Sequence, residues 1–414
     1  MKNTLKKLGA IALVLMLMLS LSVNAFAAGG AALNNGVYGD NTGIPVNNTV
    51  TITKELVVFN TDGSAINVPS VTWNYALTAG TAGATVTDAA NVTATVKAGT
   101  AAQITTGTGS VTLGGNSITA AADGTALSGT FDLTFNTAAY SDSGIYRYVL
   151  TETPAFTKAE VGINEGEGYS NVRYLDVYVR HSDDNTGYAI YGYVLYQGAA
   201  NSNQTSGSEV GKTNGFVHTD DANKTKAADY YKTFNATIGK TTQGTGADKN
   251  HKFAFEVTFT NASVSSSLID LIAATTTAGK ATITDPAAGA LASTTISPAI
   301  ADGGSVTITG IPAGTTVSVK ETNDTPDYYD VTATIDGTAT TVAEINTAPS
   351  ASNTVSKAGA AATENQATIA FAWTNEITLI SPTGVVMRVA PYALMLIGGI
   401  VLLVISRRRK AEEA

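Results

Sequence analysis

The chain has 414 residues, of which 14% are charged, and a formal net charge of −9. This acidic balance, with basic residues gathered only at the extreme C-terminus, argues against a nucleic-acid-binding protein. Cysteine is absent, which excludes disulfides and thiolate metal sites. Thr, Ala, Gly, Val and Asn dominate instead, a composition typical of β-strands joined by small-residue turns.

The first residues follow the pattern of a secretory signal peptide. Lys2, Lys6 and Lys7 precede an apolar run over residues 8–21, which closes on Ala25-Phe26-Ala27. The apolar run is too short for a retained membrane anchor, and the small-x-small ending marks a cleavage site. We therefore expect residues 1–27 to be removed between Ala27 and Ala28, and residues 28–48 to form an N-terminal segment.

Residues 49–222 are predicted to form a first β-domain. NTVTITKELVVF and VTWNYAL alternate β-branched and polar residues, and GTFDLTF and SGIYRYVLTETP continue the pattern. The segment 174–197 predicts a β-hairpin with Leu175, Val177 and Val179 on one face and a turn at residues 183–187. The acidic turn lacks the ligand spacing of a calcium loop, so we interpret it as a solvated turn.

A polar stretch, residues 223–233, is predicted to link this domain to a second one at residues 234–378. FNATIGK, HKFAFEVTFTN, GSVTITGIPAGTTVSVKETN, YYDVTATIDG and ATIAFAWTNE all have strand length and turn punctuation. Neither half contains a long amphipathic helix. The predicted fold class is therefore all-β, with two tandem immunoglobulin-like β-sandwich domains.

The C-terminus carries a second set of topogenic signals. Residues 389–406 form an uncharged run close to the length of a membrane span, and the basic residues of the tail, 407–414, would lie in the cytoplasm. Ser381-Pro382-Thr383-Gly384 stands just before the span, within residues 379–388. A type I membrane protein needs only the span and the tail, and these two segments do not account for the tetrapeptide.

The stretch SPTGVVMRVAPYALM resembles the VPTGV-type sorting signal of Gram-positive backbone pilins of the T-antigen type, with Ser381 where those proteins usually carry Val. The resemblance implies that a sortase cleaves between Thr383 and Gly384 and passes the Thr383 carbonyl to an amine. It further implies a precursor held in the membrane and a product fixed to peptidoglycan at the cell surface, in contact with other pilin subunits.

The second half also resembles the CnaB-like domains of those pilins, which form a spontaneous Lys–Asn isopeptide bond. ATIGK, GTTVSVKETN and IAFAWTNE match the family's donor, acid and acceptor strands in chain order. The resemblance implies a bond between Lys240 and Asn375 with Glu321 as the catalytic acid. Burial would lower the pKa of the lysine and raise that of the glutamate, which the reaction requires. Taken singly, these three residue types are more often solvated.

The first half matches the same pattern less completely. TITKEL places Lys54 at the donor position and SGIYRYVLTET places Glu152 at the acid position. In NGFVHTD, the expected last strand, His218 stands where the family carries Asn, and histidine cannot accept an acyl transfer. Asn214 and Asp220 lie on the same face of such a strand, so the acceptor, and with it a first-domain bond, stays open.

The resemblance also indicates which amine receives the next subunit. In the family, the polymerising lysine lies seven residues before the acceptor position of the first domain, and Lys212 is one residue from that place. Lys224 and Lys226 are the next choices. The predicted function is a wall-attached pilus shaft subunit; the alternative is a single-copy wall-anchored adhesin.

We expect no enzymatic activity, cofactor or metal. His181, His218 and His251 are the only histidines, and they fall in no metal-ligand spacing. We find no defensible carboxylate pair or nucleophile constellation for a hydrolase. The sequence identifies neither an adhesion ligand nor the class of sortase.

Overall fold

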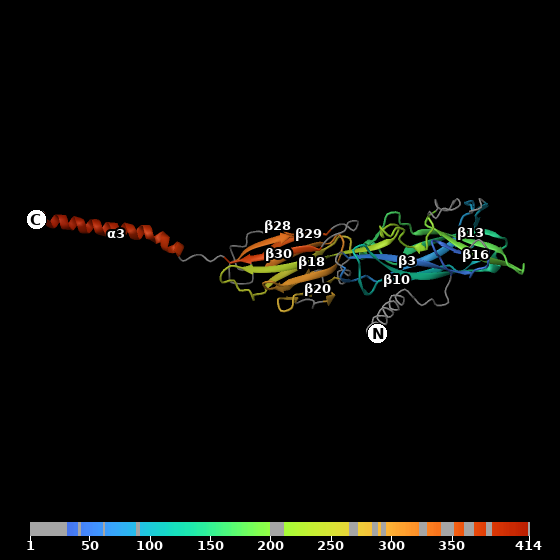
Figure 1. Cartoon of the computed structure of the whole chain (residues 1–414), viewed down its shortest axis with the longest axis horizontal. Coiled ribbons are helices and arrows are strands. Elements are labelled where there is room, and N and C mark those ends of the chain that lie inside the picture. Colours follow the sequence, from blue (N-terminus) through green and yellow to red (C-terminus); the bar gives the residue numbers. More distant parts are fainter. Residues whose placement is uncertain are drawn as a thin grey trace, which may run out of the picture.

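The protein is described here by a computed structural model, which describes residues 31–39, 43–60, 63–87, 92–198, 211–264, 272–283, 289–290, 295–322, 329–340, 352–359, 368–377 and 383–412. The regular structure of the chain is mostly β-strand, as predicted. Figure 1 shows two β-domains lying end to end, with a helix beyond the second one. The predicted signal peptide, with its cleavage site at Ala27 and Ala28, lies outside the described residues.

The first domain is built from strands β1 to β17, with three short 3-10 helices. Their bounds are β1 Ala31–Ala32, β2 Val37–Gly39, β3 Thr49–Asn60, β4 Ala65–Asn67, β5 Val71–Ala79, β6 Thr85–Thr87, β7 Thr93–Thr95, β8 Lys97–Ala98, η1 Ala101–Gln103, β9 Ile104–Thr106, β10 Thr108–Leu113, β11 Ser117–Thr119, β12 Thr125–Phe135, η2 Thr137–Ala139, β13 Gly144–Pro154, η3 Ala159–Val161, β14 Ile163–Glu165, β15 Val172–His181, β16 Tyr188–Tyr196 and β17 Gly215–Phe216.

The second domain is built from strands β18 to β30 and is followed by a helix. Their bounds are β18 Asp229–Gln243, β19 Phe253–Thr260, β20 Ala273–Thr276, β21 Ala281–Ile283, β22 Gly289–Ala290, β23 Thr295–Ile296, β24 Pro298–Ile300, β25 Ser305–Pro312, β26 Thr316–Thr322, β27 Asp330–Ile335, β28 Thr338–Thr340, β29 Ser352–Ala358, β30 Ile369–Glu376 and α3 Thr383–Glu412.

Each domain has two sheets that face each other across an apolar core. In the first domain, the sheet β9-β12-β3 faces the sheet β10-β5-β13-β15-β16-β2. In the second, the sheet β22-β20-β25-β18-β30-β27 faces β21-β24-β19-β26-β29. The alternation of apolar and polar residues along these strands explains the arrangement, because every second side chain points into the core.

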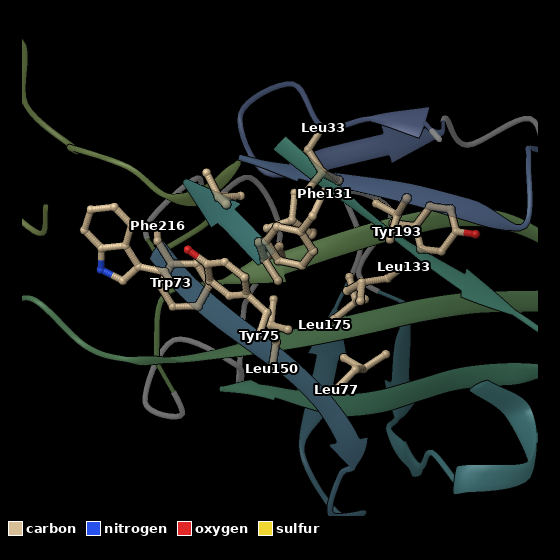
Figure 2. Close-up of a cluster of buried hydrophobic side chains, with 14 of the residues drawn as sticks. Leu33, Trp73, Tyr75, Leu77, Phe131, Leu133, Leu150, Leu175, Tyr193 and Phe216 are labelled. Carbon is tan, nitrogen blue, oxygen red and sulfur yellow. The ribbon is translucent and has the colours of Figure 1, made fainter. Parts of the chain in front are cut away.

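Aromatic side chains fill much of the first core. Trp73, Tyr75 and Leu77 come from alternate positions of β5 and are 0%, 2% and 6% exposed, so the whole row points inward (Figure 2). The ring of Tyr75 stacks on that of Phe131, with centroids 4.1 Å apart. The predicted hairpin is confirmed, since β15 and β16 pair in antiparallel fashion and Leu175, Val177 and Val179 are all buried.

Strand β18 connects the two domains. Residues 229–233 pair in parallel with β3 of the first domain, and residues 236–243 pair in parallel with β30 of the second. The polar residues 223–233 were predicted as a linker that follows the first domain. That prediction is wrong for residues 229–233, because backbone hydrogen bonding to β3 continues the strand through them.

The helix α3 contains the residues predicted as a membrane span, 389–406. Its described side chains, residues 393–408, are exposed and up to residue 405 apolar, Leu394 and Leu402 being 70% and 69% accessible. By length and mean hydropathy, none of the helices in the described part of the chain qualifies as a membrane span.

Candidate functional site

The second domain places Lys240 and Asn375 on neighbouring parallel strands. Lys240 on β18 lies opposite Trp373 on β30, and Thr242 lies opposite Asn375. Asn375 is therefore two residues beyond the partner of Lys240, so both side chains point to the same face of the sheet. That face is the buried one, since Lys240 is 2% exposed and Asn375 is fully buried.

Glu321 reaches the same point from the opposite sheet. It lies on β26, paired with Phe255 of β19, and is 1% exposed. The Lys240 ammonium donates a hydrogen bond to Glu321 Oε1 over 2.7 Å, and the Asn375 amide donates to the same oxygen over 2.7 Å. The two nitrogen atoms thus lie no farther apart than twice this distance. All three residues predicted for the site are brought together.

The surroundings of Lys240 disfavour its charged form. Burial lowers the pKa of its amine to about 8, although Glu321 opposes the shift. The Phe253 ring lies 4.2 Å from the amine and the Phe255 ring 5.8 Å. An appreciable share of neutral amine is therefore present near neutral pH, as a nucleophilic lysine requires.

The amide of Asn375 offers its carbonyl to the same carboxyl group. Within the described residues, its Oδ1 is buried without a hydrogen-bond partner, which is costly. Half a turn of the amide about its Cβ–Cγ bond exchanges the positions of Oδ1 and Nδ2. In that orientation a protonated Glu321 donates to Oδ1 and polarises the carbonyl. The arrangement can therefore support attack of an amine on an amide.

The first domain brings Lys54 and Glu152 together as well. Lys54 on β3 is fully buried, and its amine lies 3.0 Å from Glu152 Oε2 on β13. Glu152 also accepts hydrogen bonds from the hydroxyl of Tyr75, at 2.8 Å, and from that of Tyr169. Burial raises the pKa of both tyrosines, so their hydroxyls stay protonated donors.

None of the three residues considered as first-domain acceptors approaches Lys54. His218 instead contacts Glu55, with Nδ1 2.7 Å from Oε2. Asn214 Oδ1 accepts from the backbone of Gly36, and Asp220 Oδ1 from that of Ala222. The reason lies in the pairing of β17, which contacts β3 only through Gly215 and Phe216 and ends before residue 218.

A residue that sequence reasoning missed takes this place. Asp229, at the start of β18, is fully buried and its Oδ2 lies 2.5 Å from the amine of Lys54. Its other oxygen, Oδ1, lies 2.6 Å from the amine of Lys158, whose side chain is 14% exposed. The signal available in the sequence was an acidic residue within a run, ADYYKTFNATIGK, long enough to form one strand.

His218 has a perturbed environment of a different kind. Burial opposes its charge, but hydrogen bonds to Glu55 and Asp221 prevail and raise its pKa. The other two histidines pack against aromatic rings, His181 on Tyr188 and His251 on Phe253. In the part of the chain that the structure describes, no three histidine or acidic residues are grouped so that they could hold a metal ion.

Lys212, predicted as the polymerising lysine, lies beside a cleft of about 250 Å³. The cleft is polar and includes Asn35, Asn214 and His218 in its lining. Lys212 is half-buried and forms a β-bridge with Tyr196. Of the two next choices, Lys224 is half-buried and donates its amine hydrogen to the carbonyl of Gly124 over 2.8 Å, and Lys226 is exposed.

The sorting motif is described only in part. Ser381 and Pro382 lie outside the described residues, and Thr383 and Gly384 are the first two residues of α3. Cleavage between Thr383 and Gly384 stays a prediction.

Comparison with known protein families gives one match, to a domain of unknown function (DUF7601) over residues 235–370. This range contains Lys240 and Glu321 and ends before Asn375. No curated protein matches the chain.

Among solved structures, the chain is similar to major pilins of Streptococcus pyogenes. One, the major pilin protein T3.2, is 16% identical with a TM-score of 0.44, over 83% of this chain and 100% of that one. Another S. pyogenes major pilin is 18% identical with a TM-score of 0.41, over 80% and 99%. A pilus-presented adhesin is 17% identical with a TM-score of 0.25, over 50% and 36%. At these TM-scores, the likenesses do not by themselves establish a function.

Proposed function

We propose that this protein is a structural subunit of a sortase-assembled pilus shaft, fixed covalently to the wall of a Gram-positive cell. The observation that carries the proposal is the buried group of Lys240, Glu321 and Asn375. It joins the first and last strands of the domain that immediately precedes the sorting motif. A covalent tie at this place strengthens a protein against pulling and serves no turnover, so the protein is not proposed as an enzyme.

The tie forms by a self-contained acyl transfer. The neutral amine of Lys240 attacks the side-chain carbonyl carbon of Asn375, and a C–N bond forms. Protonated Glu321 polarises the carbonyl oxygen and gives its proton to the departing amide nitrogen, and the resulting carboxylate takes one proton from the attacking nitrogen. Ammonia leaves, and Glu321 ends in its starting state. Neither a cofactor nor a metal enters the balance.

The position of the tie suits a load-bearing subunit. β18 and β30 are parallel neighbours, so a pull on the C-terminal end of β30 reaches Asn375 and crosses to β18 through Lys240. The sheet hydrogen bonds between the two strands are then not the elements that carry the load. A shaft made of many such subunits does not lengthen by unfolding of this domain.

Anchoring and polymerisation follow from the C-terminal signals. The sortase cleaves Thr383–Gly384 and transfers the Thr383 carbonyl to an amine, of the next subunit during growth and of peptidoglycan at the end. The signal peptide, the apolar residues 389–406 and the basic tail support export and a membrane-held precursor. Lys212 receives the carbonyl of the incoming subunit, and the adjacent polar cleft leaves room beside it. Such head-to-tail contacts extend into filaments.

Mass spectrometry of protein released from the wall of the native host tests cleavage and cross-links together. We expect a C-terminus at Thr383 joined to an amine, and a mass lower by one ammonia for the Lys240–Asn375 bond. Recovery of residues 384–414 in the released protein contradicts the anchoring step, and unmodified Asn375 contradicts the bond.

Immunoblots of wall extracts separate the pilus shaft from its alternative, a single-copy adhesin. A shaft subunit gives a ladder of high-mass species, whereas the adhesin gives a single one. We expect Lys212→Ala to abolish the ladder, with Lys280→Ala as a matched surface-lysine control. A ladder that survives Lys212→Ala excludes Lys212, and its loss in Lys224→Ala or Lys226→Ala identifies the replacement.

A further inference from the structure

Each of the two buried lysines has a buried residue at the same register on the neighbouring parallel strand. In the second domain, the residue two positions after Lys240 is Thr242, and it lies opposite Asn375 on the parallel strand. In the first domain, the residue two positions after Lys54 is Leu56, and it lies opposite Asp229 on a parallel strand. Asp229 therefore stands to Lys54 as Asn375 stands to Lys240.

The facing sheets repeat the same plan. Glu321 is paired with Phe255, and the ring two residues earlier, Phe253, lies 4.2 Å from the Lys240 amine. Glu152 is paired with Tyr75, and the ring two residues earlier, Trp73, lies 4.5 Å from the Lys54 amine. The acid and the aromatic ring thus occupy matching positions in the two domains.

In the first domain, the acceptor comes from the strand that follows that domain in the chain. β3 is bordered along one edge by three parallel segments in succession: β1 at Val50 and Thr51, β17 at Thr53 and Lys54, and β18 from Leu56 onward. β17 ends where the acceptor is needed, and the first residue of β18 takes over. The acceptor is therefore separated from Lys54 by 175 residues and belongs to the strand that enters the second domain.

The contacts of Asp229 indicate which amine and which carboxyl oxygen are placed to react. Lys54 is fully buried and contacts Oδ2 of Asp229 at 2.5 Å as well as Glu152 at 3.0 Å. Lys158 contacts Oδ1 at 2.6 Å, but its other ion pair is with Glu165, whose side chain is 55% exposed. Of the two amines on Asp229, Lys54 is the one whose other carboxyl partner, Glu152, is buried beside the reacting groups.

We propose that Lys54 and Asp229 form a second intramolecular isopeptide bond, with Glu152 as its proton-transfer group and with loss of water. The Lys54 ammonium passes one proton to Glu152, and the neutral amine attacks the side-chain carboxyl carbon of Asp229. A C–N bond forms, and the nitrogen gives up a second proton as the tetrahedral intermediate collapses. One carboxyl oxygen leaves with both protons as water, and Glu152 returns to its carboxylate form.

This bond changes the connection between the domains. β18 then holds an acyl group at Asp229 and an amine linkage at Lys240, eleven positions apart on one strand. A pull passes from β3 through the first bond, along this short stretch of β18, and through the second bond into β30. The first bond does not depend on assembly into a filament, so it stands or falls independently of the proposed function.

The test is the mass of the purified full chain after removal of its signal peptide, together with sequencing of its cross-linked peptides. We expect the mass to be lower by one water and one ammonia, with a branched peptide that joins Lys54 to Asp229. Asp229→Asn should keep the branch but replace the loss of water by a second loss of ammonia. Asp229→Ala and Glu152→Gln should each remove the loss of water and leave the loss of ammonia in place.

Three outcomes overturn the proposal. They are separate unmodified peptides carrying Lys54 and Asp229, a branch from Asp229 to Lys158, and a loss of water that persists in Asp229→Ala. Asn375→Ala keeps this result apart from the bond in the second domain, because it should abolish the loss of ammonia and leave the loss of water unchanged. If Glu152→Gln does not fold, Asp229→Asn still decides through the identity of the leaving group.

Discussion

Removing the acceptor of the second-domain bond should weaken that domain more than the loss of any ordinary buried amide. The variant Asn375→Ala leaves the hydrogen-bonded pair of Lys240 and Glu321 in place, so no buried charge loses its partner. What disappears is the covalent closure. The loop between Lys240 and Asn375 has about 135 residues, for which the chain-entropy model of cross-links gives about 5 kcal/mol.

The loss of the amide itself adds about 1–2 kcal/mol. At about 2–4 °C per kcal/mol for a domain of this size, Tm should fall by about 12–28 °C. The assay is differential scanning calorimetry of the exported chain, followed through the transition of the second domain. Intact mass of the same samples shows whether each carries the cross-link.

Asn235→Ala is the matched control. Asn235 lies on β18, the strand of Lys240, is fully buried, and accepts one hydrogen bond of 3.3 Å from the backbone of Gly310. Its replacement removes a buried amide without touching the closure, so we expect a fall of only about 2–8 °C in Tm. If Asn375→Ala lowers Tm no more than Asn235→Ala does, although the wild-type chain carries the bond, the stabilisation that we assign to the closure is wrong.

Three other perturbations have defined outcomes. Asp176 accepts two hydrogen bonds of 2.6 Å from the buried Arg147, so Asp176→Ala leaves a buried charge without this partner. The free energy of unfolding measured in urea should fall by about 3–5 kcal/mol. Replacement of the exposed Asp132 by alanine should lower it by less than about 1 kcal/mol. Because the pKa of His218 is raised in the folded state, the stability that its charged form contributes is fully present below about pH 6.5. This stability is lost as pH rises through the folded-state pKa. The Tm difference between wild type and His218→Gln should therefore shrink on going to alkaline pH; a difference that grows would contradict the pairing with Glu55. In Asn375→Ala, the Lys240 amine stays free, and its lowered pKa of about 8 means that the unfolded state binds more protons above that pH. Stability should accordingly rise from pH 8 to about 9.5, and the rise should be absent when Lys240→Met is added.

Local patterns were enough to predict most strands, and the resemblance to CnaB-like domains was needed to predict the three residues of the second-domain site. The alternation in NTVTITKELVVF corresponds to β3, and the residues matched for donor, acid and acceptor meet within hydrogen-bond distance. In that domain the acceptor lies on a strand, β30, that pairs with β18 without interruption. A register that continues along a whole strand can be counted from the sequence.

The first-domain acceptor could not be found in this way. Counting along NGFVHTD assumes that its pairing with β3 continues to residue 218, but β17 contains only Gly215 and Phe216. The next segment along the edge of β3 begins at residue 229, after a turn whose path depends on tertiary contacts. Composition misled in the same region, because the polar stretch predicted as a linker, residues 223–233, includes the start of a strand.

The charged groups around each proposed acceptor explain why the first domain can use an aspartate where the second domain uses an asparagine. Asp229 is flanked by two amines, Lys54 and Lys158, so its negative charge is paired before any reaction, and the buried ions stay compensated until water leaves. Asn375 meets a single amine, which the carboxyl of Glu321 already pairs; a second carboxylate there would add an unpaired buried charge. Each site keeps its buried charges balanced through its own set of partners, and this balance predicts that Asn375→Asp is tolerated less well than Asp229→Asn.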